Sequence, residues 1–584
     1  SKQPKKIQRA KNTCDSKQSK KPAKSKNSSK LKSFIRTIPI SIALASALSS
    51  QAVAGWSNGN NGTLNCSGDT CVVNANRHQQ QISTTNNGTI QNLTINSGVT
   101  VAGWGGGGHN SGVGVALNQN ALIHVEVGDA GDITNEGTMI IYDNGRIIRV
   151  ASGKRVGNFT NNGNMTITGD AILVHGSMGD FINTGNITSS GKIFYITGSG
   201  ANISDILLTS GLVKAGSNVL EVAGSATLGS FIVSNNAQVE GNMNISGQIT
   251  DRIAIQDSAS VTGNISLAGS SAIANGITIG GNSSGGSGNN TSLTGNISLA
   301  GRSSISKILI DGSNSSGANG TPKLDGDITL NTSNEITNGI TIANGGTYDG
   351  TIHNRNSSSI GGVVVDNGTI VGDIIASGTS RLNGITIVNG GEMQGNIIGQ
   401  HVSGSSGNAM NLGNIDIQSR LQGGITLANG ATIESLRLSN RGTITNAVSI
   451  GESGSNNQTS ILKTITLNGA SGINSLVVGS SNDNAGTIKS ITLDGNSSIG
   501  SINVAQRGTI ANLEIGNASQ VGSIGSIGSI TNAGKLQNIT LNNTSTITNG
   551  ITNEANGNIG TITSNTNNIN NIITNSGTIN DLVV

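Results

Sequence analysis

Short stretches in which apolar and polar residues alternate recur along most of this 584-residue chain. The stretch 487–493, which reads Thr-Ile-Lys-Ser-Ile-Thr-Leu, is one of them. A period of two is typical of a β-strand with one buried face, whereas an amphipathic helix repeats about every 3.6 residues. Asn-Gly, Ser-Gly and Asn-Ser pairs bound these stretches, and such residues tolerate the positive φ of tight turns. The pattern predicts an all-β fold built from short strands.

The strand-like stretches are copies of a few units. The heptapeptide at 263–269 returns unchanged at 295–301, and the pattern of 487–493 recurs at 89–95, 432–438, 509–515 and 535–541. Most spacings between copies fit whole steps of about 18–26 residues, the scale of one solenoid turn. Strands this short cannot bury an apolar face alone, so they have to stack on the next turn. The repeats predict a right-handed parallel β-helix (β-solenoid) with aliphatic residues stacked inside and Thr or Asn stacked outside.

The length of the chain gives an estimate of the size of this solenoid. With roughly 21 residues per turn, the residues after position 54 predict about 25 turns, and a spacing of about 4.8 Å per strand gives a rod of roughly 120 Å. The alternative is an array of antiparallel β-sandwiches, which favour aromatic cores and domain-sized breaks in composition. Eight of the nine aromatic residues after position 54 precede residue 232. We therefore expect a less regular N-terminal or cap region at 55–231 and regular solenoid repeats at 232–584, with loops at 103–114, 280–290 and 311–320.

Composition excludes several other classes. The chain has 86 Gly but only 4 Pro, with no Gly-X-Y period, so it is not collagen. Its three Cys are too few for a disulfide scaffold, and its steady content of Ile, Leu and Val argues against disorder. Because the composition hardly changes over most of the chain, one repetitive structure is expected rather than several domains.

The charge is divided between two unlike parts. Residues 1–36 contain 13 Lys or Arg and one acidic residue, which leaves 20 basic and 29 acidic residues in the remainder. An uncharged apolar stretch follows and ends in Ala52-Val53-Ala54 before Gly55. A basic region, a short apolar region and a small-x-small site form a secretory signal peptide, here residues 1–54 with cleavage between Ala54 and Gly55. The apolar stretch is too short for a permanent membrane span, which needs about 20 residues.

The signal peptide predicts export through the inner membrane, to the cell surface, the outer membrane or the extracellular medium. The alternative for the basic region is a nucleic-acid-binding arm. Such an arm would need neither the apolar segment nor the cleavage site behind it. We expect no nucleic-acid partner.

Two sites of covalent modification are predicted. Cys66 and Cys71 flank four residues and are expected to form a disulfide in an oxidising compartment, while Cys14 lies in the leader. Two Cys without a nearby His cannot fill a zinc shell. Asp494-Gly495-Asn496-Ser497-Ser498 matches the acidic sequon of some bacterial N-glycosylation systems, which makes Asn496 a candidate acceptor.

The leader followed by Asn/Gly/Thr/Ile-rich β-helix repeats resembles the passenger domains of bacterial autotransporters (type V secretion). The Asn-Gly-Gly units at 344–346 and 389–391 look like the turns of self-associating adhesins of that group, and the wider texture is similar to vacuolating-cytotoxin-like passengers. The resemblance implies an outer-membrane β-barrel translocator, which this chain lacks. We expect truncation before the barrel. A separate translocator is the alternative, but the Asn-Pro-Asn motifs usual in two-partner systems are missing, because no Pro lies between Pro39 and Pro322.

Candidate catalytic and metal sites are weak. The segment 281–285 fits the nucleophile pattern G-x-S-x-G but lacks its strand-to-helix context, and 285–290 resembles a calcium repeat in which Asn289 replaces the carboxylate. No His has a metal-ligand spacing to another His or Cys. We expect no enzyme activity, metal or cofactor. All six His are expected at the surface or in loops: His78, His109, His124, His175, His353 and His401.

The remaining functional feature is the surface of the rod. A long polar exterior suits multivalent adhesion to host-cell glycans, to matrix proteins or to another copy of the chain. The first alternative is a vacuolating-type toxin, which would need an apolar N-terminal segment after cleavage, whereas 55–65 is polar. The second alternative is a passive surface stalk that displays the region 55–231.

Overall fold

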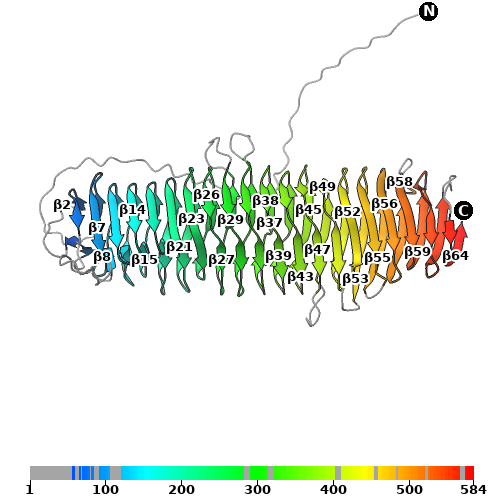
Figure 1. The fold of residues 1–584 in the computed structure, drawn as a ribbon, viewed down its shortest axis with the longest axis horizontal. Coiled ribbons are helices and arrows are strands. Elements are labelled where there is room, and N and C mark those ends of the chain that lie inside the picture. Colours follow the sequence, from blue (N-terminus) through cyan, green and yellow to red (C-terminus); the bar gives the residue numbers. More distant parts are fainter. Residues whose placement is uncertain are drawn as a thin grey trace, which may run out of the picture. The chain divides into compact units, whose positions relative to one another are not determined.

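A computed structural model describes residues 56–58, 65–67, 69–78, 81–84, 91–104, 120–281, 290–313, 321–401, 410–452, 458–481, 484–519, 524–565 and 573–584. The chain divides into two units, Ser1–Ala45 and Ser46–Val584, and every described residue belongs to the second. The described part of this unit contains strands and no helix, arranged as stacked parallel coils (Figure 1). Its strands form one sheet of 34 and another of 30 strands. The predicted all-β parallel solenoid is confirmed.

One turn in the N-terminal half has four short strands. The first two, β14 and β15, belong to the 34-stranded sheet, and the next two, β16 and β17, belong to the 30-stranded sheet. The chain then enters β18, which lies parallel to β14 with Asn186 opposite Asn164, 22 residues earlier. The strands of this turn are β14 (Asn164–Ile167), β15 (Ile172–Val174), β16 (Ser177–Met178), β17 (Phe181–Asn183) and β18 (Asn186–Ser189).

Towards the C-terminal end each turn has one longer strand per sheet. In the 30-stranded sheet β53 (Thr459–Leu467), β55 (Ala485–Leu493) and β57 (Gly508–Ile515) stack in parallel. Ile491 lies between Ile465 and Leu513, and Thr492 lies between Thr466 and Glu514. The copies at 487–493 and 509–515 are therefore stacked in the same register, as the repeats predict.

The solenoid has fewer turns than its length predicts. It contains about 18 turns rather than 25, so at about 4.8 Å per turn it extends for about 85 Å rather than 120 Å. The difference arises because several turns carry extra residues outside the strands. Ile308 stacks on Ile277, 31 residues earlier, and Ile133 stacks on Leu93, 40 residues earlier.

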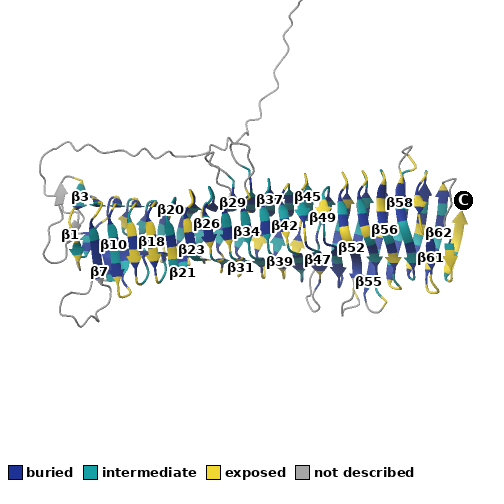
Figure 2. Ribbon diagram, turned by 45° about the horizontal axis from the view of Figure 1, so that its top comes forward, coloured by how far each residue is buried: buried dark blue, intermediate teal, exposed yellow. Residues whose placement is uncertain are grey.

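The interior is a set of aliphatic columns. One column runs from Ile265 through Ile297, Ile328, Ile352, Ile374, Ile397, Ile425, Val448, Leu476, Ile502 and Ile530 to Ile551. All of these residues are buried (Figure 2). Such burial contributes roughly 25 cal/mol per Å² of apolar surface removed from water, which is the main stabilising term of a fold with so few aromatic residues.

Asparagine also stacks inside the solenoid, which the sequence analysis did not predict. Asn135 Nδ2 donates to Asn161 Oδ1 at 2.7 Å, and Asn161 Nδ2 donates to Asn183 Oδ1 at 2.6 Å. All three side chains are fully buried. Because each amide has both a donor and an acceptor, identical residues on successive turns satisfy one another.

The regions 55–231 and 232–584 share the same two sheets. The strand β22 (Thr227–Val233) crosses residue 231 and pairs with β20 (Asn202–Leu208) before it and with β25 (Arg252–Ile255) after it. At the corners, glycine allows the turns to approach each other closely. A Cβ on Gly185 would lie 1.7 Å from Gly163 O, so no other residue fits there without a shift of the backbone.

Candidate functional site

The outward face of the C-terminal half carries columns of polar side chains. In the 30-stranded sheet one column contains Thr466, Thr492, Glu514, Thr540 and Thr563 on successive turns. These side chains alternate with buried Ile and Leu, so the strand period presents every one of them to the outside. A surface of this kind repeats hydroxyl, carboxylate and amide groups at the spacing of the turns.

Ion pairs join neighbouring turns on this surface. Lys323 Nζ lies 3.0 Å from Asp325 Oδ2 on its own strand and 2.9 Å from Asp349 Oδ2 on the next turn. Hydrogen bonds to Asp349 and Asp325 raise the pKa of Lys323 above its usual value. The other pairs between turns are Lys192–Glu221, Lys214–Glu240, Arg420–Glu392, Arg437–Asp416 and Lys463–Glu434. Exposed pairs of this kind stabilise a fold little, but they neutralise charge locally along the rod.

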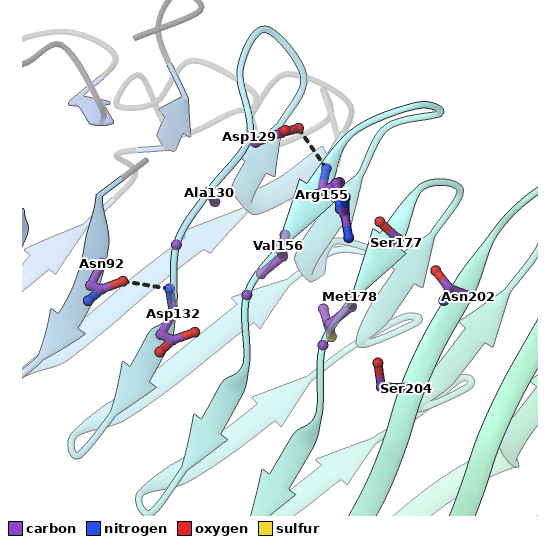
Figure 3. A pocket seen from close by; sticks show the side chains of 13 residues that line it. Asn92, Asp129, Ala130, Asp132, Arg155, Val156, Ser177, Met178, Asn202 and Ser204 are labelled. Carbon is purple, nitrogen blue, oxygen red and sulfur yellow. Dashed lines mark hydrogen bonds between the residues drawn. The ribbon is translucent and has the colours of Figure 1, made fainter. Parts of the chain in front are cut away.

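A shallow groove of about 500 Å³ crosses five successive turns near the N-terminal end of the described solenoid. It follows the bend between the two strand columns of the 30-stranded sheet. Figure 3 shows Asp129, Arg155, Ser177 and Asn202 on successive turns along one side. Asp132 and Ser204 lie on the other side. The groove is therefore lined by polar side chains and runs along the axis of the solenoid.

Glycine and aspartate or asparagine together build the floor of this groove. Asp132 Oδ1 accepts a hydrogen bond from the backbone N–H of Asn158 on the next turn at 2.8 Å. A Cβ on Gly157 would lie 2.3 Å from the same oxygen. Asn92 repeats this contact with the N–H of Asp132 at 2.8 Å, beside Gly131. The Gly-Asx pairs therefore serve the stacking of the turns and leave an open bend above it.

His124 is the most deeply buried ionisable side chain near this end, because it is 1% exposed on β8 (Ala121–Val125). Its Nε2 lies 2.8 Å from Nη1 of Arg149, which can only donate, so Nε2 accepts and the proton is on Nδ1. Glu126 Oε2 lies 3.5 Å from that Nδ1. Burial lowers the pKa of His124 below its usual value, with Glu126 opposing this and Arg149 adding to it.

We predict a pH dependence of stability from this histidine. A lowered pKa in the folded state means that the unfolded chain binds the extra proton more readily. Stability is therefore greatest above the unfolded pKa of about 6.5 and falls as the pH drops below it. Thermal unfolding at about pH 7.5 and 5.5 should show a larger loss of midpoint for the native chain than for His124→Gln. Equal losses for the two proteins would contradict the prediction.

The placement of the six histidines is only partly as expected. The expectation of a surface or loop position is wrong for His124 and for His401, which is 4% exposed and contacts Gly378 O through Nδ1 at 2.9 Å. Both are held inside by hydrogen bonds with a neighbouring turn, which spacing along the sequence does not reveal. His78 is exposed, His175 and His353 are half-buried, and His109 lies outside the described residues.

The predicted modification sites have different positions. Cys71 on β3 (Thr70–Val73) is disulfide-bonded, and Cys66 on β2 (Asn65–Ser67) is its direct partner in an antiparallel pair. Asn496 is exposed at a turn with a φ of 66°. The cleavage residues Ala52, Ala54 and Gly55 lie outside the described residues, as do Asn282–Asn289 of the G-x-S-x-G and calcium-like segments and most of the predicted loops at 103–114 and 311–320.

Comparisons with known proteins give no relative. The sequence matches no protein family, no curated protein and no solved structure. Within the described residues, no cluster of three or more His, Cys, Asp or Glu side chains is arranged to hold a metal ion. The same part of the chain has no helix of the length and apolarity that a membrane crossing requires. The architecture is compatible with an autotransporter passenger.

Proposed function

We propose that this chain is the passenger of an exported bacterial autotransporter and acts as an adhesin through many weak contacts along its solenoid. The observation that carries this proposal is the register of the outward polar columns. Thr466, Thr492 and Thr540 illustrate it, because each offers a hydroxyl at the same position of its turn. Several weak contacts made in register gain affinity by avidity without any single deep site.

Charge supports the same proposal. After residue 36 the chain has 29 acidic and 20 basic residues, and many of the charges pair between turns. The surface is therefore polar with a modest net negative charge, which favours hydrogen bonding with glycans, matrix proteins or another copy of the chain over binding of a polyanion. Export to the cell surface, which the leader predicts, would bring this surface into contact with such partners.

The test is adhesion by beads that carry the purified full chain. Coated beads are expected to bind epithelial cells, immobilised matrix proteins or one another, whereas beads coated with an unrelated protein should not. The triple variant Thr466→Lys, Thr492→Lys and Thr540→Lys places like charges on one face and should weaken the adhesion if that face contributes. Failure of the native chain to bind cells, matrix or itself would overturn the proposal.

A further inference from the structure

The groove over β12 (Arg155–Val156) and β16 is long relative to its depth. It extends over five turns, from Asn92 to Ser204, which at about 4.8 Å per turn is about 19 Å. This length suits a chain molecule lying along the solenoid axis rather than one compact small molecule. Polar groups recur on each turn along the groove, so a ligand with repeating polar groups would meet a partner at every step.

The backbone of the groove leaves no edge for a peptide strand. Ser177 N–H donates to Lys154 O at 2.8 Å, and Gly179 N–H donates to Val156 O at 3.1 Å. The backbone groups on the floor are thus used between turns of the solenoid. A peptide that binds by adding a strand needs an unpaired sheet edge, so this mode does not fit the groove.

Charge and polarity exclude two further classes of ligand. The groove has two carboxylates, Asp129 and Asp132, and one guanidinium, Arg155, whereas a nucleic acid or sulfated polymer needs an excess of basic groups. Its apolar members, Val156 and Met178, are 4% and 1% exposed because their side chains belong to the core. A lipid chain would find no apolar wall.

We propose that the groove binds a neutral linear glycan along the solenoid axis, an inference that rests on the adhesin function proposed above and gives that function a ligand class. Sugar hydroxyls both donate and accept hydrogen bonds, so they match carboxylate, guanidinium, hydroxyl and amide groups placed turn after turn. No aromatic side chain is among the residues that line the groove. Binding of one glycan chain is therefore weak, and adhesion depends on many copies.

The experiment is binding of the full chain to an array of linear glycans, with neutral chains in one set and sialylated or sulfated chains in another. Ser177→Trp should fill the groove from its wall. Ser304→Trp is the matched control, because Ser304 on β32 (Ser304–Ile305) has the same burial pattern and the same place in the turn, three turns beyond Asn202 along a continuous column.

The native chain and Ser304→Trp are expected to retain at least one neutral glycan, and Ser177→Trp should lose that signal by about tenfold, or about 1.4 kcal/mol. The neutral signal should also persist between roughly 50 and 500 mM salt, because no net charge is neutralised on binding. Binding to no neutral glycan, binding to the charged set alone, or equal signals from the two Trp variants would each overturn the proposal.

The same variants separate this inference from the adhesin function. If beads carrying Ser177→Trp adhere as well as beads carrying Ser304→Trp, the groove is not the adhesive site and the adhesin function still stands on the outward columns. If native beads do not adhere while the array shows groove-dependent binding, the adhesin function is wrong and the glycan site remains.

Discussion

Ile491→Asp is expected to unfold the turns around β55. The side chain is fully buried and lies between Ile465 and Leu513 in an aliphatic column. A carboxylate there has no ion-pair partner and would be buried at a cost of several kcal/mol, about 4 or more, which is a large fraction of the stability of any domain. Because each turn contacts only its neighbours, the loss should be concentrated in the turns that include β53, β55 and β57.

Thr492→Asp is the matched control for this change. It introduces the same side chain on the same strand one residue later, where the strand period directs it outwards and leaves it half-buried. We expect its effect to be within about 0.5 kcal/mol. Thermal unfolding by circular dichroism, together with protease cleavage mapped to 459–515, measures both effects. Equal loss from the two variants would contradict the assignment of Ile491 to the interior.

Phe181→Ala should produce the next largest loss of stability, about 3–5 kcal/mol. Phe181 is fully buried, its ring stacks on that of Phe159 at 5.2 Å between centroids, and it meets Phe194 of the facing sheet edge-on at 4.8 Å. These rings close the interior where the two sheets face each other. Truncation removes both ring contacts and leaves a cavity that neighbouring turns cannot fill, because their backbones are fixed by pairing on either side.

The control for this cavity is Ile182→Ala. Ile182 is the next residue on β17 but is half-buried on the outward side, so it should cost less than about 1 kcal/mol. Phe181→Leu keeps part of the volume and should fall between the two. Urea unfolding followed by circular dichroism gives the order. If Ile182→Ala destabilises the protein as much as Phe181→Ala, the account of this part of the core is wrong.

The repeats predicted the register of the strands because identical stretches stack on each other. The copies at 263–269 and 295–301 show this, since Ile265 lies opposite Ile297, Ser266 opposite Ser298 and Leu267 opposite Leu299. In a parallel stack a shift by one residue would turn every aliphatic side chain outwards. Alternation and repetition together therefore leave a single register, and the sequence contains both.

The features that were not predicted depend on contacts between turns. The turn count was overestimated because residues in loops, such as those between Ile277 and Ile308, add length without adding a strand. His124 is buried because Arg149 of the next turn satisfies its ring. Asn161 is buried because the same residue type stands above and below it. None of these partners is near in sequence, so local alternation does not identify them.

The groove could have been predicted only in part. Gly-Asx pairs at 131–132, 157–158 and 179–180 recur before successive strands, and this repetition is visible in the sequence. That the pairs open a bend lined by Asp129, Arg155 and Ser177 requires the stacked structure. A search for catalytic or metal-binding motifs does not detect such a site, because its members are ordinary polar residues from different turns.

Disulfide cross-linking between turns tests the parallel stacking itself. Thr492→Cys with Glu514→Cys joins outward positions that are direct partners on neighbouring turns, about 4.8 Å apart, which is within the range for a disulfide. Thr492→Cys with Thr540→Cys places the same kind of residue two turns apart, about 10 Å, which is too far. Under mild oxidation we predict that mass spectrometry will find the linked peptide only for the first pair. A second pair that links equally well, or a first pair that stays reduced, would contradict the parallel solenoid.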